Sequence, residues 1–140
     1  MILNFLFPRK YGERTYSVVT LILRVVFGLM LIGHGFQKIE GFSAMSSGFP
    51  DPLGIGSCAS LVLAIFGEFA CSIALILGVL SRLAVIPMII TMAVAFFGAH
   101  GGNIADGELA LAYLVVFVAL LISGPGRYSI DGTIARRLRR

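Results

Sequence analysis

The chain has 140 residues, of which 58% are hydrophobic and only 13% are charged, and its mean hydropathy is +0.97. Soluble domains are usually about 45–50% apolar and about 25% charged, so much of this chain is expected to face lipid instead of water. The length predicts one domain without a separate catalytic one. The net charge of +4 does not indicate nucleic-acid binding, because the basic residues lie at the ends of apolar segments and not along one polar face.

Four apolar segments predict an all-α fold, an integral membrane bundle of four helices. The segments are residues 17–39, 57–80, 83–99 and 107–123. A span needs roughly 17–25 residues and must be helical in lipid. The apolar part of the fourth segment starts only at Leu109 and is short for a span, so we expect its helix to extend back through Glu108 and Asp106 or forward toward Pro125. The first segment lacks a small-residue cleavage site, which predicts a retained span and not a signal peptide.

The segments outside and between the spans complete this organisation. The short turn at Ser81–Arg82 predicts that spans two and three are antiparallel neighbours. Residues 1–16 form an N-terminal segment, 17–126 the transmembrane domain and 127–140 a basic tail. The apolar stretch Met1–Pro8 is too short to span, and we expect it either to lie in the membrane interface or to fray.

The basic residues predict the orientation of the bundle. Those on one side are Arg9, Lys10, Arg14, Arg82, Arg127, Arg136, Arg137, Arg139 and Arg140. On the other side Lys38 is the single basic residue, and several carboxylates surround it. Because short flanks rich in Lys and Arg stay in the cytoplasm, we expect a multi-pass protein of the bacterial inner membrane with both termini inside.

The first span carries a polar stripe. On a helix, Arg24, His34 and Lys38 fall within an arc of about 80°, and bulky apolar residues such as Ile22 and Phe36 lie on the opposite face. Polar groups within spans face the bundle interior or a water-filled cavity. The stripe is therefore expected to face the other helices.

Glu68 lies near the middle of the second span, where a carboxylate costs about 2.5–3.5 kcal/mol on insertion scales. Its expected partner is the stripe, through Arg24 from one side or His34 from the other. Two interpretations of Arg24 and Glu68 stay open: a buried ion pair that fixes helix register, or a functional site such as a proton or anion relay or a headgroup site for a quinone or lipid. A seam of small residues beside Glu68 predicts close helix packing: Ser60, Ala64, Gly67, Cys71, Ala74 and Gly78.

Two further polar clusters are expected at the ends of the bundle. At the outer end, a Lys38–Glu108 ion pair would join spans one and four, and His34 and His100 are weak metal-ligand candidates because their spacing fits no metal motif. On the cytoplasmic side, a structural clamp is favoured over a ligand site. Its expected members are Arg82, Arg127, Ser129 and Asp131.

The order of these residues resembles the DoxX family of bacterial four-helix membrane proteins. The resemblance covers about residues 21–131 and rests on Arg24, Gly28, HGFQK at 34–38, GF at 41–42, GE at 67–68, LILGVLSR at 75–82, His100, ELALAYL at 108–114 and GPGRYSID at 124–131. It implies the four-helix bundle and the inner membrane. The positions that match the family pattern are Arg24, Gly35, Lys38, Glu68, Gly78, Glu108 and the Gly-Pro-Gly turn.

The function that the resemblance implies is broad. The family is named after the small subunit of an archaeal thiosulfate:quinone oxidoreductase, and some bacterial relatives are linked to oxidative-stress complexes. Since Cys58 and Cys71 lie about 20 Å apart on one predicted helix, the chain has no cysteine pair, and sulfur chemistry is not carried over.

Three functional hypotheses follow. The favoured one is an accessory or structural subunit of a larger membrane complex, redox or respiratory, without catalytic activity of its own; its partners would be other membrane subunits or a second copy of the chain. The alternatives are a quinone-linked oxidoreductase component with a pocket between spans one and two, and a small transporter or carrier. Quinone or lipid is the candidate ligand, and no other cofactor is predicted.

Overall fold

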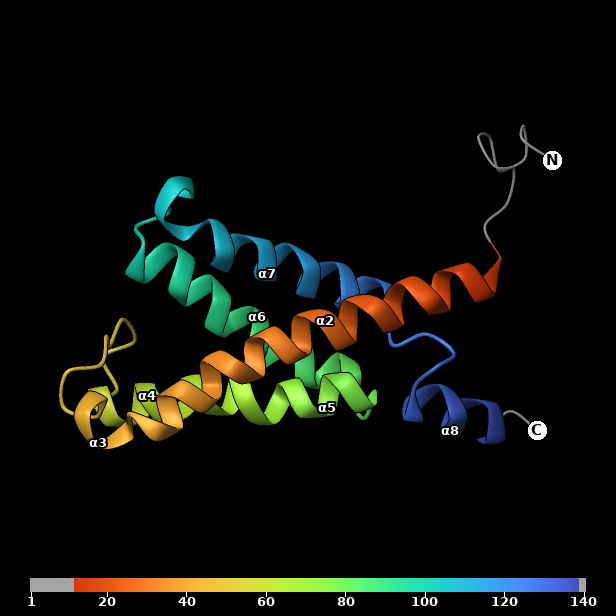
Figure 1. The fold of residues 1–140 in the computed structure, drawn as a ribbon, viewed down its shortest axis with the longest axis horizontal. Helices are drawn as coiled ribbons and strands as arrows, with labels where there is room; N and C mark the ends of the chain where they lie inside the picture. The colour runs from red at the N-terminus through yellow and green to blue at the C-terminus, as the bar shows by residue number, and fades with distance from the viewer. Residues whose placement is uncertain (1–11, 139–140) are drawn as a thin grey trace.

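A computed structural model describes residues 12–138 and places them in helices joined by short loops, with no strand in that part of the chain (Figure 1). The elements are α2 (Glu13–Glu40), α3 (Phe42–Met45), α4 (Ser57–Ile65), η1 (Phe66–Ala70), α5 (Cys71–Leu77), α6 (Ser81–Ala93), η2 (Val94–Ala99), α7 (Ile104–Ser123) and α8 (Ile130–Leu138). The all-α prediction is confirmed. The expectation for Met1–Pro8 lies outside the described residues.

Four stretches of helix are long and apolar enough to cross a membrane, as the hydropathy predicts. They are α2, Ser57–Leu77 (α4, η1 and α5), Ser81–Ala99 (α6 and η2), and α7. The fourth begins at Ile104, three residues before the expected 107, because the Asn103 side chain caps it by accepting a hydrogen bond from the amide of Ala105. The second ends three residues before the expected 80, because Gly78 adopts a left-handed conformation with φ of 73°.

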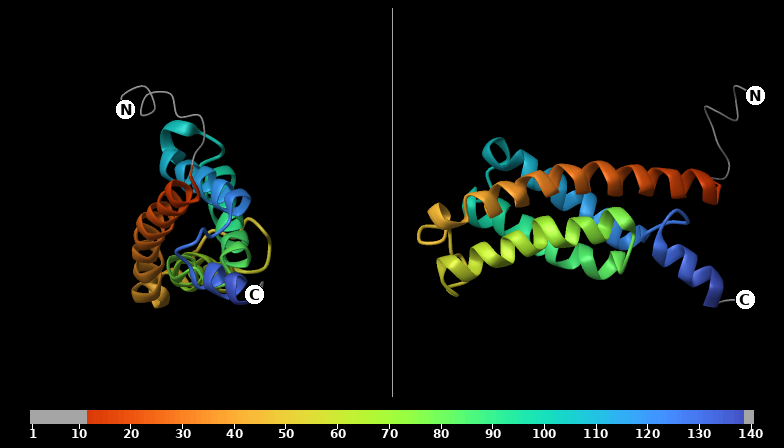
Figure 2. Two further views of the ribbon diagram at one scale, coloured as in Figure 1. Left: turned by 90° about the vertical axis from the view of Figure 1, so that its right-hand side faces the viewer. Right: turned by 60° about the horizontal axis from the view of Figure 1, so that its bottom comes forward.

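The spans form a bundle with two distinct ends (Figures 1 and 2). One end, which we call the terminal end, contains the start of α2, the turn at 78–80 and α8. At the other, the loop end, lie residues 41–56 and 100–103. Within the bundle α2 packs along α4, η1 and α5, and α6 packs against both α5 and α7. Spans two and three are therefore antiparallel neighbours, as the short turn predicts.

One π-helical segment lies inside span two and another ends span three, and the sequence pattern does not predict them. The segment η1 carries Glu68, and η2 completes the third span. An inserted π turn shifts the side chains after it around the helix, and such segments are frequent at functional sites. Both segments line the same cavity, described below.

Glycines allow α2 to approach span two closely. A methyl group added at Gly35 would lie 2.9 Å from both the backbone nitrogen and the Cβ of Phe69, which is closer than real carbon contacts allow. Gly28, on the same face of α2, packs against the side chain of Ile76, whose Cγ1 would lie 2.6 Å from an added methyl group. Arg24, Gly28 and Gly35 are all buried, so this face of α2 meets the bundle as the stripe predicts.

We predict that Gly35→Ala destabilises the bundle by about 1–3 kcal/mol, because the added methyl group would push α2 off the backbone of η1. Gly33→Ala on the same helix is the matched control: nothing lies within 4 Å of its added carbon, so it is expected to be neutral or to stabilise by up to about 1 kcal/mol. Thermal unfolding in detergent measures both. Equal effects of the two substitutions would contradict close packing at Gly35.

Candidate functional site

The central polar contact of the bundle is an ion pair between Lys38, in the last turn of α2, and Glu68 in η1. The Lys38 Nζ lies 2.6 Å from the Glu68 Oε2, and the two side chains are 21% and 6% exposed. The polar stripe of α2 thus supplies the partner of Glu68, as expected, but through Lys38 and not through Arg24 or His34, and the expected Lys38–Glu108 pair is wrong. Because α2 crosses η1 at Gly35, Lys38 comes level with Glu68, whereas Arg24 lies fourteen residues, about 21 Å, further along α2.

Arg24 is buried at the terminal end, where its guanidinium binds backbone carbonyls instead of a carboxylate. Its Nε donates to the Leu75 carbonyl at 3.0 Å, and its Nη2 donates to those of Ile76 at 3.2 Å and Tyr128 at 3.0 Å. Its Nη1 donates to the carbonyl of Pro125. The carbonyls at the end of a helix carry partial negative charge, so they stabilise a cation in this position. Arg24 thus joins α2, the end of α5 and the segment after α7.

Asp131 fastens the start of α8 to the turn between α5 and α6. Its carboxylate accepts hydrogen bonds from the amides of Leu80 and Ser81, each at 2.8 Å, and its own amide donates to the Gly78 carbonyl at 2.9 Å. Burial alone would raise the pKa of Asp131, but these hydrogen bonds and the nearby charge of Arg24 lower it below its usual range. The carboxylate is therefore ionised at neutral pH.

The other residues expected in the cytoplasmic clamp lie near this turn but contribute differently. The Ser129 hydroxyl donates to the Gly126 carbonyl at 2.7 Å and accepts from the amide of Gly132 at 2.9 Å. The guanidinium of Arg82 lies beside Gly124. Arg127 contacts the bundle through its backbone, since its amide donates to the Ser17 hydroxyl at 3.1 Å.

A cavity of about 530 Å³ lies between spans two and three at the loop end. Its wall is mostly apolar and includes Leu63, Ala64, Ile90, Val94 and Ala95. Glu68 lines it from span two, and α2 contributes only Lys38. The sequence predicts a pocket between spans one and two, whereas most of the wall of this cavity comes from spans two and three and from residues 49–53.

The loop at residues 49–53 covers the end of this cavity, and Asp51 holds the loop in place. The Asp51 carboxylate accepts hydrogen bonds from the amides of Ile55 at 3.0 Å and Gly56 at 2.7 Å and from the Ser60 hydroxyl at 2.8 Å. The bond from Ser60, followed by that from Gly56, holds the pKa of Asp51 below its usual range. The loop is thus tied to the start of α4.

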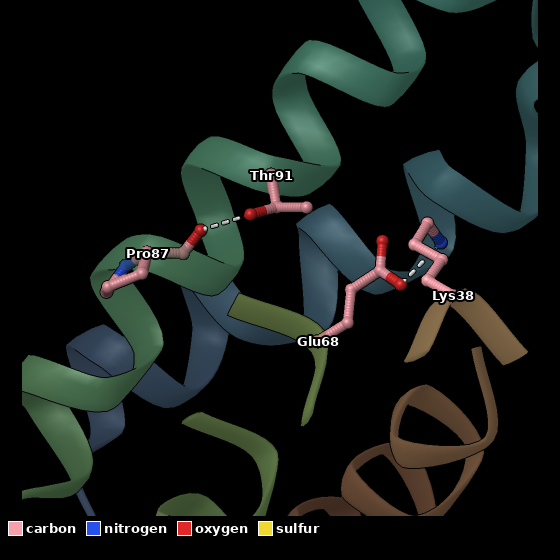
Figure 3. A network of polar contacts seen from close by, with 4 residues as sticks. All are labelled: Lys38, Glu68, Pro87 and Thr91. Carbon is pink, nitrogen blue, oxygen red and sulfur yellow. Dashed lines mark hydrogen bonds and ion pairs between the residues drawn. The ribbon is translucent and has the colours of Figure 1, made fainter. Parts of the chain in front are cut away.

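The polar groups in the cavity retain unused hydrogen-bonding capacity (Figure 3). An ammonium has three donors, and in the described residues Lys38 uses one of them, on Glu68. The Thr91 hydroxyl donates to the Pro87 carbonyl at 2.9 Å, points away from Glu68 and packs against Gly67. A ligand beside the ion pair would therefore meet donors on Lys38 and an acceptor on Glu68.

The remaining candidates lie apart from this cavity. The His34 ring packs edge-on against Tyr113, with ring centroids 6.2 Å apart, while His100 and Glu108 are exposed. Within residues 12–138, no group of three His, Cys, Asp or Glu side chains gathers as a metal site requires.

Sequence reasoning missed Thr91, the loop at 49–53 and the buried hydroxyl of Tyr113. Tyr113 is 1% exposed, and its hydroxyl has no hydrogen-bond partner in the described part of the chain. The sequence could have indicated Thr91 as a candidate, because it is a polar residue within the apolar third span.

Comparison with known proteins places the chain among small bacterial membrane proteins. The profile of the DoxX family matches residues 19–101. An uncharacterised protein of Haemophilus influenzae is 33% identical over 82% of this chain and 90% of its own length. The inner membrane protein YphA of Escherichia coli is 30% identical over 81% and 89%. An uncharacterised membrane protein of Mycobacterium tuberculosis is 28% identical over 91% and 86%. No solved structure matches the chain.

We predict that Lys38→Met destabilises the bundle by about 3 kcal/mol, because it leaves the Glu68 carboxylate buried without a counter-charge. The double variant Lys38→Met/Glu68→Leu is expected to recover most of this loss, since no charge is then left unpaired. Unfolding in detergent gives the free energies for the double-mutant cycle.

Glu40→Gln, an exposed carboxylate two residues from Lys38, is the control and is expected to change the unfolding free energy by less than about 0.5 kcal/mol. Additive losses in the Lys38/Glu68 double variant would contradict the pairing.

Proposed function

This chain belongs to the DoxX family, and we propose that it binds a lipophilic quinone in the cavity between spans two and three, with the quinone headgroup against Lys38 and Glu68. It is a multi-pass protein of the bacterial inner membrane. The observation that carries the proposal is the placement of a single ion pair, only 2.6 Å long, in an otherwise apolar cavity of about 530 Å³. Small-molecule sites are typically apolar cavities of about 300–1,000 Å³ with a few convergent polar groups.

The charges of the cavity favour a neutral headgroup over an anionic one. Lys38 and Glu68 neutralise each other, and the further charged residue in the wall is Asp51, a carboxylate. A phosphate headgroup would therefore meet two carboxylates and one ammonium. A quinone carbonyl can instead accept from the free donors of Lys38, and a quinol hydroxyl can donate to Glu68. These features support a quinone or quinol over an anionic lipid.

The wall of the cavity also favours a ligand that arrives through the bilayer. Leu63 of α4 and Ile90 of α6 line the cavity and are still 51% and 53% exposed, on the lipid-facing sides of spans two and three. Residues 49–53 of the loop line the cavity on the side away from the bundle centre. Lateral entry suits a molecule dissolved in the membrane, as quinones are.

We further place both termini in the cytoplasm, which puts the cavity in the outer half of the membrane. This orientation is supported by five arginines of the described chain that all lie at the terminal end: Arg14, Arg82, Arg127, Arg136 and Arg137.

A role as a subunit of a larger redox complex stays a prediction. In such a complex, this chain would supply the quinone-binding cavity. A transporter is less favoured, because transporter sites use discontinuous helices, whereas spans two and three stay helical through their π segments.

Binding is tested by titrating the protein in nanodiscs with a short-chain benzoquinone and measuring the quinone retained after size exclusion, with empty nanodiscs as the blank. Saturable binding is expected. Lys38→Met should weaken it about tenfold or more, because it removes a charged donor worth about 1.5–3 kcal/mol.

Two further variants make this experiment decisive. Ala95→Phe fills the cavity without touching the ion pair and is expected to abolish binding, whereas Glu40→Gln lies outside the cavity and should bind as the unmodified chain does. Quinone uptake no greater than that of empty nanodiscs, or undiminished binding by a folded Ala95→Phe variant, would refute the proposal.

A further inference from the structure

The last helix, α8, carries an apolar stripe that no other part of the described chain covers. Ile130, Ile134 and Leu138 recur every four residues, so they lie on one face of the helix. They are 44%, 49% and 82% exposed, and α8 has no buried residue. Nothing in the bundle therefore accounts for the apolar character of this face.

The structure holds the start of α8 at the level where the membrane spans end. Asp131 binds the amides of Leu80 and Ser81, and Ser81 is the first residue of span three. Figures 1 and 2 show α8 leaving the bundle at this terminal end. Leu80 and Leu83, next to the anchor point, are each 62% exposed. The lipid-facing surface of the spans thus leads to the start of α8.

The terminal end is also strongly basic. Its charged surface residues are Arg14, Arg82, Arg127, Arg136 and Arg137, against Glu13 and the anchored Asp131, so the described residues give five positive and two negative charges, a net +3. At the loop end Glu40, Asp51, Asp106 and Glu108 carry four negative charges, and the Lys38–Glu68 pair adds no net charge, so the net charge there is −4. A basic surface at the edge of a bilayer attracts anionic lipids.

We propose that α8 is an interfacial helix, with the stripe Ile130, Ile134 and Leu138 at the acyl-chain boundary and the flanking arginines against anionic phospholipid headgroups. Interfacial helices typically combine apolar residues on one face with basic residues beside them, and α8 has both. The observations favour a lipid surface over a protein partner because Asp131, next to Ile130 in the chain, binds the amide of Leu80, an exposed apolar residue at the end of the spans. This inference is independent of the quinone site, which lies at the opposite end of the bundle.

The chain contains no tryptophan, so a single introduced tryptophan reports on α8 alone. Ile134→Trp places it in the stripe, and Ala135→Trp places it about 100° further round the same helix as the matched control. Both variants are reconstituted in liposomes of phosphatidylcholine with phosphatidylglycerol, which contain no scaffold protein and therefore no other tryptophan. Emission of Ile134→Trp is expected at shorter wavelength than that of Ala135→Trp, with stronger quenching by lipids brominated in the acyl chain.

The anionic preference is measured in the Ile134→Trp protein by energy transfer to dansyl-labelled phosphatidylglycerol, compared with dansyl-labelled phosphatidylcholine. Transfer to phosphatidylglycerol is expected to exceed transfer to phosphatidylcholine. Adding Arg136→Gln and Arg137→Gln should reduce this preference, by up to about fivefold in local lipid enrichment for each arginine removed.

Either of two results would overturn the proposal. One is an emission of the Ile134→Trp protein that matches a water-exposed tryptophan and is not quenched by brominated lipid, as docking to a soluble partner would leave it. The other is equal energy transfer to both labelled lipids.

Discussion

A carboxylate in the middle of a membrane span must be neutralised, and in this bundle the Lys38 ammonium neutralises Glu68 at a distance of 2.6 Å. The pair fixes how far α2 slides along span two, because Lys38 reaches Glu68 only when α2 crosses η1 at Gly35. The same register leaves Arg24 at the terminal end, where backbone carbonyls stabilise its charge instead of a carboxylate. The charge of Glu68 is thus stabilised by an ion pair and the charge of Arg24 by backbone carbonyls. These contacts together position α2, span two and the segment after α7.

Most of the fold could be predicted from the sequence, because the bilayer directly dictates how long an apolar segment must be and that it must be helical. The four spans, the antiparallel turn near Ser81 and the inward face of α2 all follow from those two signals. The partners of Lys38, Glu68 and Arg24 could not be predicted in the same way. A helical wheel gives the face on which a side chain lies but not its height relative to a neighbouring helix, and that height depends on the close contact of Gly35 with Phe69.

The cavity illustrates the same limit of sequence reasoning. Its position depends on the π segments η1 and η2 and on a loop that Asp51 fastens to the start of α4, and no hydropathy or charge pattern encodes these features. The result is a bundle whose two ends differ in chemistry. The loop end holds an apolar cavity with one ion pair, and the terminal end holds Arg24, Asp131 and the basic helix α8. The two proposals, ligand binding in the cavity and anchoring through α8, therefore concern separate parts of a small protein.

The most direct test of the central claim, that the cavity at Lys38 and Glu68 holds a quinone, is photo-crosslinking with a lipid-soluble azidoquinone followed by mass spectrometry of the labelled peptides. The account predicts labels concentrated at residues 49–68 and 90–99, and their loss when a short-chain quinone competes. Labels spread over lipid-facing positions such as Ile22 and Ile122, unchanged by the competitor, would show that the quinone only dissolves in the surrounding lipid and would contradict the account.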